Sequence, residues 1–442
     1  MSTQKRPRIV IIGGGFGGLS AVQSVASSAV EVLLIDRNNY HTFSPMLYQV
    51  ATAELGAEQI AYPIRNILRK LPNTQFLQAE VKRIDFAQRA VETDRTVIFY
   101  DFLILATGSV TQILSVPGAA EYAFRLDNLR QAIALRNHIL RCFEQAAYES
   151  NPERRRQRLT FTIIGGGPTG IELAGALVEL LGNSLKRDYP VLDFRQVKVL
   201  LVQSGSRLLR DMPERSQRYT QRQLQKMGVK VILDAKVNRI TSGAVHLQDG
   251  RIILTESPIW TVGVQANSLL RQWGLPMGDK GKVTVLPALQ VPDHPEVYGV
   301  GDLALLKESG QPLPMVAPAA IQQGRRAAEN IQRQLIGRQP VPFKYWNKGA
   351  IAMIGRNAAA AQIGKFVFTG FPAWLLWLGV HLVYLPGFRN RLQVLIDWLW
   401  DYFLRDRPAR FVLPTSGAIA ETYPTPDHKS DEVRQIYNRQ RV

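Results

Sequence analysis

The sequence predicts an α/β protein with two Rossmann-like dinucleotide-binding domains, because it contains two glycine-rich turns about 150 residues apart. The first turn is Gly13–Gly18 and the second is Gly165–Gly170. Each turn follows an apolar, β-branched run and precedes a segment compatible with a helix, which is the context in which G-x-G-x-x-G binds a pyrophosphate. One such match is weak evidence. Two matches in one chain predict two dinucleotides, a flavin and a nicotinamide.

The glycines of each turn have separate expected roles. The first allows a tight turn, the third lets backbone approach the pyrophosphate, and the last lets the helix pack closely on the strand. The pyrophosphate then lies at a helix N-terminus, where free N–H groups and the helix dipole favour an anion. The expected cofactor-binding glycines of the two turns are Gly13, Gly15, Gly17, Gly18, Gly165, Gly167 and Gly170.

The first domain is expected to begin with a parallel sheet formed by residues 8–12, 32–36 and 102–108, with a helix over 17–29 between the first two strands. Asp36 ends the second strand, 23 residues after Gly13, where this fold places the acid that binds a ribose. A turn-capping role for Asp36 is the alternative. Thr107 and Gly108 end the third strand and are expected to contact the same cofactor.

The second domain repeats this pattern, with a change at the position of the acid. Its second strand is expected at 198–202, and Gln203 follows it, 38 residues after Gly165. A neutral side chain there removes the charge that would repel a 2′-phosphate, and Arg207 could pair with one. Two interpretations stay open: NADPH is accepted as well as NADH, or Gln203 simply hydrogen-bonds the ribose of NADH.

Two later strand-to-glycine turns are expected to return the chain to the first domain. The first, over 259–263, resembles 105–108 in pattern. The second, over 297–302, places Asp302 at a strand end directly after Gly301. An acid in that position suits a hydrogen bond to a ribityl hydroxyl of FAD, which makes Gly301 and Asp302 candidate cofactor-binding residues.

Composition narrows the class of partner. The formal net charge of +18 implies attraction to polyanions, but no zinc-finger spacing, RNP signature or basic-helix pattern favours nucleic acid, so an anionic membrane surface is the expected partner. The basic cluster over 154–158 is interpreted as a solvated face. The six histidines are scattered, so no metal site is expected.

The single cysteine, Cys142, excludes an intramolecular disulfide and a Cys-x-x-Cys site. Its apolar neighbours predict a buried thiol in a helix. No signal peptide precedes the first strand, so the protein is expected on the cytosolic side.

The C-terminal region predicts membrane association. Residues 366–388 contain no Lys, Arg, Asp or Glu and are nominally long enough to cross a bilayer, although glycines and prolines interrupt them. Residues 390–404 predict an amphipathic helix lying in the membrane interface. A helix packed on the protein or on a second subunit is the alternative, and a single membrane span stays open. The polar stripe of this helix is Gln393, Asp397, Asp401 and Arg405, and its apolar face is Leu392, Leu395, Ile396, Leu399 and Phe403, flanked by Trp398 and Trp400.

With these motifs, the chain resembles the type II (alternative) NAD(P)H:quinone oxidoreductases over nearly its whole length, to about Arg410. These are single-subunit FAD enzymes that do not pump protons and are held monotopically on a membrane. The 40–51 and C-terminal segments are more specific to this family than the glycine motifs. The stretches that carry the resemblance are 13–18, 40–51, 165–172, 297–302 and 381–391.

The family's quinone motif, A-Q-x-A-x-Q-x-G, matches residues 317–324, except that Pro318 replaces the first glutamine. Proline has neither a side-chain amide nor an N–H, so it cannot make the polar contact implied there. The resemblance implies that Gln322 lies in the quinone site and Ala319 beside the flavin, with a structural contact as the alternative for Gln322. It also implies a catalytic role for Glu172, which relays a proton or holds donor and acceptor in register; a helix N-terminal acid is the simpler alternative.

The expected function is hydride transfer from NADH or NADPH to FAD, followed by passage of two electrons to a membrane quinone. The quinone tail would enter between the C-terminal helices and the segment around Pro45–Gln49, which makes Pro45 a candidate site residue. The alternatives are a membrane-bound flavin redox sensor and a reductase with a soluble acceptor, and a homodimer stays open. The expected divisions are 1–125 and 266–340 for FAD, 126–265 for NAD(P)H, 341–410 for membrane association and 411–442 as a polar tail.

Overall fold

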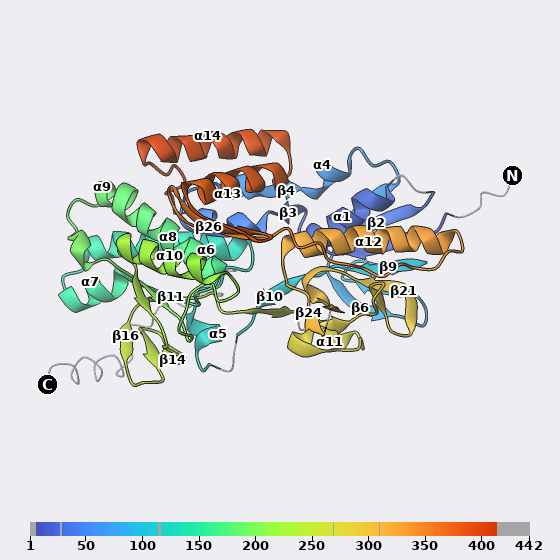
Figure 1. The fold of residues 1–442 in the computed structure, drawn as a ribbon, viewed down its shortest axis with the longest axis horizontal. Coiled ribbons are helices and arrows are strands. Elements are labelled where there is room, and N and C mark those ends of the chain that lie inside the picture. The colour runs from blue at the N-terminus through green and yellow to red at the C-terminus, as the bar shows by residue number, and fades with distance from the viewer. Residues whose placement is uncertain (1–5, 27–28, 114–115, 268, 309, 413–442) are drawn as a thin grey trace. The chain divides into compact units, whose positions relative to one another are not determined.

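The computed structural model describes residues 6–26, 29–113, 116–267, 269–308 and 310–412, which form two units (Figure 1). Each unit contains its own parallel sheet and one of the two glycine turns, which confirms the predicted α/β architecture. The expected polar tail lies, from residue 413 on, outside the described residues. Unit 1 comprises Met1–Thr42, Ala61–Val110 and Val264–Lys348, and unit 2 comprises Phe43–Ile60, Thr111–Gly263 and Gly349–Val442.

The main sheet of unit 1 has six strands in the order β20-β21-β9-β1-β2-β5. Strand β1 lies parallel to both β2 and β9, and β-branched side chains such as Val10 are fully buried. Strands covered on both faces read as continuous apolar runs, which is why they were recognisable in the sequence. The bounds are β1 Arg8–Ile12, β2 Glu31–Asp36, β5 Thr74–Gln78, β9 Phe102–Leu105, β20 Gln290–Val291 and β21 His294–Gly299.

Two helices of unit 1 pack against each other beside this sheet, α1 (Phe16–Val25) and α12 (Ala317–Leu335) (Figure 1). Helix α1 ends at Val25, earlier than the predicted end at residue 29. The helices approach so closely that a Cβ on Gly324 would lie 2.1 Å from the Gly17 carbonyl oxygen. Other elements within unit 1 include β3 Tyr40–Thr42, β4 Ala61–Pro63, α4 Ile64–Leu68, β6 Val81–Asp85, β7 Ala90–Thr93, β8 Val97–Phe99, β18 Val264–Ala266, α11 Leu269–Gln272, β19 Val283–Thr284, β22 Ala304–Leu305, β23 Lys307–Glu308 and β24 Gln311–Pro312.

The main sheet of unit 2 has four strands in the order β13-β12-β11-β17. Strand β17 pairs in parallel with β11, so the prediction that 259–263 returns to the first domain was wrong. Every residue of β17 is buried, and an apolar pattern of this kind fits a buried strand of either sheet. The bounds are β11 Thr160–Ile164, β12 Lys198–Val202, β13 Lys230–Ile232 and β17 Ser257–Trp260, with helices α5 Ala119–Tyr122, α6 Leu129–Tyr148, α7 Pro152–Arg158, α8 Pro168–Glu179 and α10 Glu214–Lys226.

The connection from α8 to β12 is long, as its spacing predicted. It contains a π-helical segment, Leu180–Leu185, followed by α9 (Lys186–Asp188). Cys142 lies buried in α6, which confirms the predicted buried thiol in a helix, and burial raises the pKa of this thiol to about 12. A small antiparallel sheet consists of β14 Val237–Thr241, β15 Ala244–Leu247 and β16 Ile252–Leu254.

A segment early in the chain belongs to unit 2 rather than to the unit that surrounds it in sequence. Residues 43–60 form α2 (Leu47–Ala51) and α3 (Ala57–Ile60), and α2 packs on α6 and α8. Every residue of α2 is buried. The sequence did not predict this placement, which brings the 43–60 segment to the C-terminal region.

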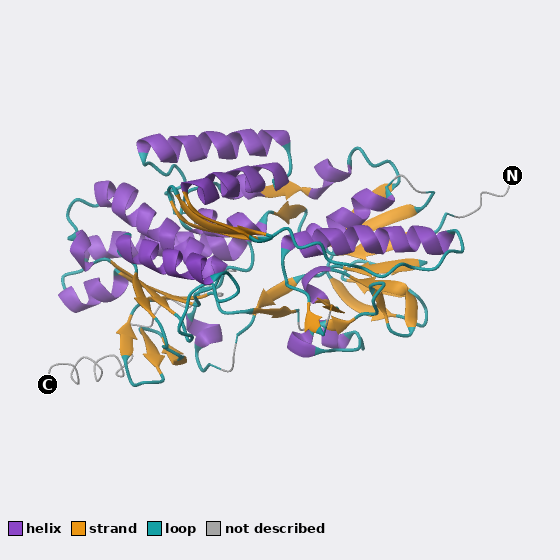
Figure 2. Cartoon of the chain, viewed as in Figure 1, coloured by secondary structure: helices purple, strands orange, loops and turns teal. Residues whose placement is uncertain are grey.

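The C-terminal region forms a three-stranded antiparallel sheet covered by two helices (Figure 2). Helix α13 (Phe371–Tyr384) packs on β26 and lies beside α14 (Phe388–Leu404). The apolar 366–388 stretch is therefore part strand and part helix. Within the described residues, no helix is both long and apolar enough to cross a membrane. The strands are β25 Ala350–Gly355, β26 Ala358–Ile363 and β27 Phe366–Gly370.

Helix α14 has the predicted two faces, and the structure shows which one meets the protein. Asp401 of the polar stripe is buried, and Asp397 accepts a hydrogen bond from the Gln59 amide. Trp398 is also buried, whereas Trp400 is half exposed. The exposed apolar residues of α14 include the five of the predicted apolar face, Leu392, Leu395, Ile396, Leu399 and Phe403.

Candidate functional site

The first glycine turn is shaped by close backbone packing at the end of β1. Gly13 has φ +109°, and a Cβ there would lie 2.3 Å from the Ala106 carbonyl oxygen. A Cβ on Gly18 would lie 1.9 Å from the Gly13 carbonyl oxygen. Both positions therefore require glycine, as the motif predicts.

Asp36 holds this turn from the end of β2. Its Oδ2 accepts the Gly14 N–H at 2.6 Å and its Oδ1 accepts the Asn38 N–H at 2.7 Å. Burial raises the pKa of Asp36, and the two amide hydrogen bonds partly offset that effect. The carboxylate lies beside the turn, where a ribose is expected, and it also has the capping role considered as the alternative. His41, which the sequence did not single out, binds the Gly14 carbonyl oxygen through Nδ1 at 2.9 Å.

Unit 1 has space for a flavin dinucleotide. A Cβ on Gly15 or Gly108 would meet nothing within 4 Å, and the Thr107 hydroxyl is buried without a hydrogen-bond partner. Helix α1 has no side-chain N-cap, so amides of its first turn are available to an anion. These features fit FAD.

Asp302 lies at the predicted strand end. Its Oδ2 accepts the Ser109 hydroxyl at 2.6 Å, and burial raises the pKa of its carboxyl. The adjacent Gly301 N–H donates to Gln323 Oε1 at 2.7 Å. Gln323 is a second residue that the sequence did not identify, because its neighbour Gln322 matched the motif.

The second turn repeats the geometry of the first. Gly165 has φ +115°, and a Cβ on Gly170 would lie 2.0 Å from the Gly165 carbonyl oxygen. A Cβ on Gly167 would meet nothing within 4 Å. The Gly166 N–H donates to Gln203 Oε1 at 2.9 Å, so Gln203 takes the place that Asp36 has in unit 1. This turn fits a nicotinamide dinucleotide.

Arg207 has a carboxylate partner. Its Nη1 lies 3.5 Å from Glu214 Oε1, and its side chain is more than half exposed. Exposed pairs of this kind contribute little stability, so Arg207 can exchange Glu214 for another anion at little cost.

Glu172 lies in α8, in the second turn after the nucleotide end of the helix. Its Oε1 accepts the Met353 N–H at 3.3 Å. Burial raises the pKa of Glu172 to about 8, although the Met353 amide and the Trp377 indole lower it somewhat. The carboxyl therefore carries a proton for most of the time at neutral pH, which is a requirement for a proton donor.

The residues of the quinone motif lie at the start of α12. Pro318 occupies the first turn, where an N–H has no helical partner, so proline is tolerated there. Gln322 donates to the Trp346 carbonyl oxygen and accepts the Trp346 N–H, both at 3.0 Å. Ala319 is buried. The paired bonds of Gln322 have the geometry of a structural contact, and its role toward a quinone stays a prediction.

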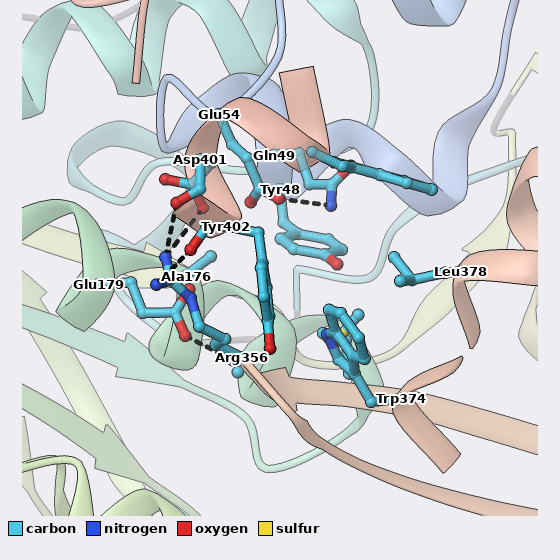
Figure 3. Close-up of a pocket in the computed structure, with 13 residues that line it drawn as sticks. Tyr48, Gln49, Glu54, Ala176, Glu179, Arg356, Trp374, Leu378, Asp401 and Tyr402 are labelled. Atoms are coloured by element: carbon cyan, nitrogen blue, oxygen red, sulfur yellow. Dashed lines mark hydrogen bonds and ion pairs between the residues drawn. The ribbon is translucent and has the colours of Figure 1, made fainter. Parts of the chain in front are cut away.

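Unit 2 contains a pocket where the 43–60 segment, α8 and the C-terminal region meet (Figure 3). The rings of Trp374 and Tyr402 line it, with centroids 5.5 Å apart and planes tilted by 32°. Three buried polar atoms of its lining have no hydrogen-bond partner: Tyr48 Oη, Gln49 Oε1 and Trp398 Nε1. Because buried polar groups are normally paired, these three atoms are available to bind the polar groups of a ligand.

A buried ionic cluster lies along one side of this pocket. Arg407 Nη1 donates to the carbonyl oxygens of Thr52 at 3.0 Å and Ala176 at 2.8 Å. Arg407 Nη2 donates to Glu179 Oε2 at 3.2 Å and lies 3.6 Å from Glu54 Oε2. The sequence did not identify Glu54 or Arg407, although an acid within an apolar stretch was a usable signal for Glu54.

Metal chemistry has no evident site here. Among the described residues there is no group of three or more His, Cys, Asp or Glu side chains able to hold a metal ion.

The chain is similar to known flavoproteins over most of its length. Residues 7–324 match the family model of the pyridine nucleotide-disulphide oxidoreductases. The chain is 37% identical to the type II NADH:quinone oxidoreductase Ndh of Mycobacterium tuberculosis, with 95% of this chain and 92% of that protein covered. It is 30% identical to the demethylphylloquinone reductase NdbB of Synechocystis, with 90% and 96% covered. Its fold matches that of NDH2 from Plasmodium falciparum in complex with NADH, at a TM-score of 0.85 and 18% identity, with 93% of this chain and 100% of that chain covered.

A pair of alanine substitutions tests the second turn. Gly170→Ala places a methyl against the Gly165 carbonyl oxygen, so it should lower the free energy of unfolding by about 1–3 kcal/mol, as overpacking does. Gly167→Ala should leave the melting temperature unchanged, because its methyl has free space, but should raise the KM for nicotinamide nucleotide about tenfold or more by filling the pyrophosphate space. Equal effects of both variants on stability would contradict the assignment. Thermal unfolding and steady-state kinetics measure the two outcomes.

Proposed function

The chain belongs to the type II NADH:quinone oxidoreductases, within the pyridine nucleotide-disulphide oxidoreductase family, and we propose that it oxidises NADH and reduces a quinone without pumping protons. FAD is its cofactor and NADH its substrate. The observation that carries the proposal is the duplicated glycine turn. In both copies the N–H of the second glycine donates to the side chain after the second strand, which is Asp36 in unit 1 and Gln203 in unit 2.

The residues of the two turns bind and orient the nucleotides. Gly15 and Gly167 leave room for a pyrophosphate, and α1 and α8 present their N-terminal amides to it. Asp36 and Asp302 would hold the hydroxyls of FAD, whose isoalloxazine supplies the two-electron chemistry when bound. Thr107 and Gly108 line the same space.

Quinone reduction needs protons as well as electrons, and Glu172 is placed to hold one. Its carboxyl is largely neutral at pH 7, and α8 connects it to both the nucleotide turn and the pocket of unit 2. We assign the pocket to the quinone ring, with Tyr48 and Gln49 contributing from the segment that contains Pro45. The roles of Gln322 toward the quinone and of Ala319 toward the flavin stay predictions from the resemblance.

Cysteine chemistry is excluded as the route of electrons. The chain has one cysteine, and a redox-active dithiol requires two. Cys142 is also buried and keeps its proton at neutral pH.

Membrane association is part of the proposal. The outward faces of α13 and α14 expose large apolar side chains, including Phe371, Leu375, Val383 and Phe403. A soluble protein rarely leaves so many large apolar residues on one face, and the net charge of +18 favours an anionic bilayer. We therefore propose peripheral binding to the cytoplasmic face of a membrane, through which a quinone tail reaches the pocket. A second copy of the chain covering this face is the alternative.

The function is tested by anaerobic flavin spectroscopy on the purified holoenzyme. NADH should bleach the flavin absorbance promptly, and a short-chain quinone should restore it. Bleaching without recovery would instead support the flavin sensor or another acceptor, and absence of bleaching by either nucleotide would overturn the assignment of the second turn.

Nucleotide preference depends on Gln203. We propose NADH as the donor, with NADPH tolerated because the side chain at this position is neutral and Arg207 is nearby. Gln203→Glu should lower kcat/KM for NADPH by about tenfold or more and change kcat/KM for NADH less, because a carboxylate repels a 2′-phosphate. Equal effects on both nucleotides would mean that Gln203 does not face the 2′ position.

Vesicle binding tests the membrane face. The double variant Ile396→Gln, Phe403→Gln should weaken binding to anionic vesicles about tenfold or more, since each side chain buries apolar area worth ~1.5–3 kcal/mol in the bilayer. The control is Tyr148→Gln, Val191→Gln, which changes two apolar residues that lie outside α13 and α14 and are more exposed than Ile396 and Phe403. Sedimentation with vesicles measures both, and equal binding of the two variants would contradict the proposed face.

A further inference from the structure

The pocket of unit 2 contains a hydrogen-bonded pair of polar side chains, Gln49 and Glu54, of which Glu54 has no role in the proposed function. Gln49 Nε2 donates to Glu54 Oε1 at 3.0 Å, and Figure 3 shows the two side chains joined at the edge of the pocket. The other end of this amide, Gln49 Oε1, is buried without a partner. Gln49 is 2% exposed, so water does not readily satisfy this oxygen.

The orientation of the Gln49 amide depends on the charge of Glu54. A carboxylate only accepts hydrogen bonds, so an ionised Glu54 faces the Gln49 amide nitrogen. A protonated Glu54 can donate to the Gln49 oxygen instead, and a half-turn of the amide then directs its NH₂ group away from Glu54. The group that Gln49 offers to a ligand therefore changes from an acceptor to a donor when Glu54 is protonated.

The charges of the surrounding cluster favour a proton on Glu54. Three carboxylates, Glu54, Glu179 and Asp401, face two guanidinium groups, Arg356 and Arg407. If every group is ionised, the cluster contains three negative charges and two positive charges, so its net charge is negative. A buried excess charge is costly, so one carboxyl takes a proton.

Glu54 is the least stabilised of the three carboxylates. Glu179 accepts hydrogen bonds from the Arg356 N–H at 2.6 Å and from Arg407 Nη2 at 3.2 Å. Asp401 lies 3.6 Å from each of the two guanidinium groups. Among the described residues, the carboxylate of Glu54 has a guanidinium group on one side only, 3.6 Å away, and accepts one hydrogen bond, from Gln49.

The groups packed around Glu54 act in both directions. Burial raises the pKa of Glu54 to about 8, Arg407 and Arg356 lower it, and Asp401 and Glu179 raise it. Tyr48, on the same segment, keeps its proton because burial and Glu172, Glu54 and Glu179 raise its pKa. Glu54 is thus the group of this cluster whose charge changes just above neutral pH.

We propose that Glu54 is a positioning residue that sets, through Gln49, whether the pocket offers a donor or an acceptor to a ring oxygen of the electron acceptor. This inference rests on the proposed function. A quinone oxygen only accepts hydrogen bonds, whereas the hydroxyl of the reduced quinol also donates. When Glu54 is neutral, Gln49 offers its NH₂ group, which donates to an oxygen of the quinone. When Glu54 is ionised, Gln49 offers its oxygen, which accepts from a hydroxyl of the quinol. Tyr48 donates to either form.

The pH dependence of the quinone KM tests this. In the unaltered enzyme the KM should rise about fivefold as the pH passes through ~8, because one neutral hydrogen bond to the quinone is lost. Inhibition by added quinol should become stronger over the same range. In Glu54→Gln, the new amide donates to Gln49 at every pH, so the KM should stay at its low-pH value throughout.

Two further variants test whether the pH dependence is specific to Glu54 and whether it requires Gln49. Glu58→Gln removes a carboxylate from the exposed side of α3, four residues away, and should retain the rise in KM. Gln49→Leu should raise the KM at low pH and remove its pH dependence. For each variant, bleaching of the flavin by NADH and the melting temperature show that the fold and the nucleotide half are intact.

The outcomes separate this inference from the function on which it rests. If no quinone reoxidises the reduced enzyme at any pH, the proposed function fails. If the enzyme turns over but Glu54→Gln shows the same rise in KM as the unaltered protein, the inference is wrong and the function stands. A pH-independent KM in the unaltered protein would also overturn the inference.

Discussion

The guanidinium of Arg407 is the contact on which the pocket of unit 2 depends. It binds the backbone of the 43–60 segment through Thr52 and the backbone of α8 through Ala176, while belonging to the C-terminal region itself. These segments are far apart in the sequence, and a buried charge holds its partners in place because losing any of them leaves it unsatisfied. Burial alone would lower the pKa of Arg407, but the three carboxylates outweigh burial and keep the guanidinium charged.

Helix α8 connects the pocket that Arg407 stabilises to the nucleotide turn. Its N-terminus follows Gly167, Glu172 lies in its second turn, and Ala176 and Glu179 line the pocket. Twelve residues of α-helix span about 18 Å, so one rigid element connects the two ends. Within unit 2, this helix therefore connects the second glycine turn, the Glu172 carboxyl and the pocket.

The two turns show how one backbone geometry serves two different nucleotides. In each turn, the third glycine, Gly15 or Gly167, has open space beside it. The N–H of the second glycine donates to the side chain that follows the second strand, Asp36 in unit 1 and Gln203 in unit 2. What differs is the charge of that anchor. Asp36 is an acid and Gln203 is a neutral amide, and we propose that the side chain at this position in unit 2 sets the preference for a ribose or its 2′-phosphate.

Much of this could be predicted from the sequence because the signals are local. The strands ending at Ile12, Asp36 and Val202 and the glycines of both turns follow from runs of a few residues. The sheet that β17 joins, the placement of 43–60 in unit 2 and the Arg407 cluster depend on contacts between distant segments. The two faces of α14 were also visible, but an amphipathic pattern does not say which face meets the protein. Asp401 shows the answer, since its carboxyl pairs with Arg356 and Arg407 inside the unit.

Photolabelling tests most directly whether the quinone ring binds in the pocket of unit 2. A short-chain quinone with a photoreactive group would be irradiated with the holoenzyme, and the labelled peptides identified by mass spectrometry. If the quinone ring binds there, Tyr48, Trp374 or Tyr402 becomes labelled, and an excess of unlabelled quinone prevents this labelling. Competable label confined to unit 1 would contradict it.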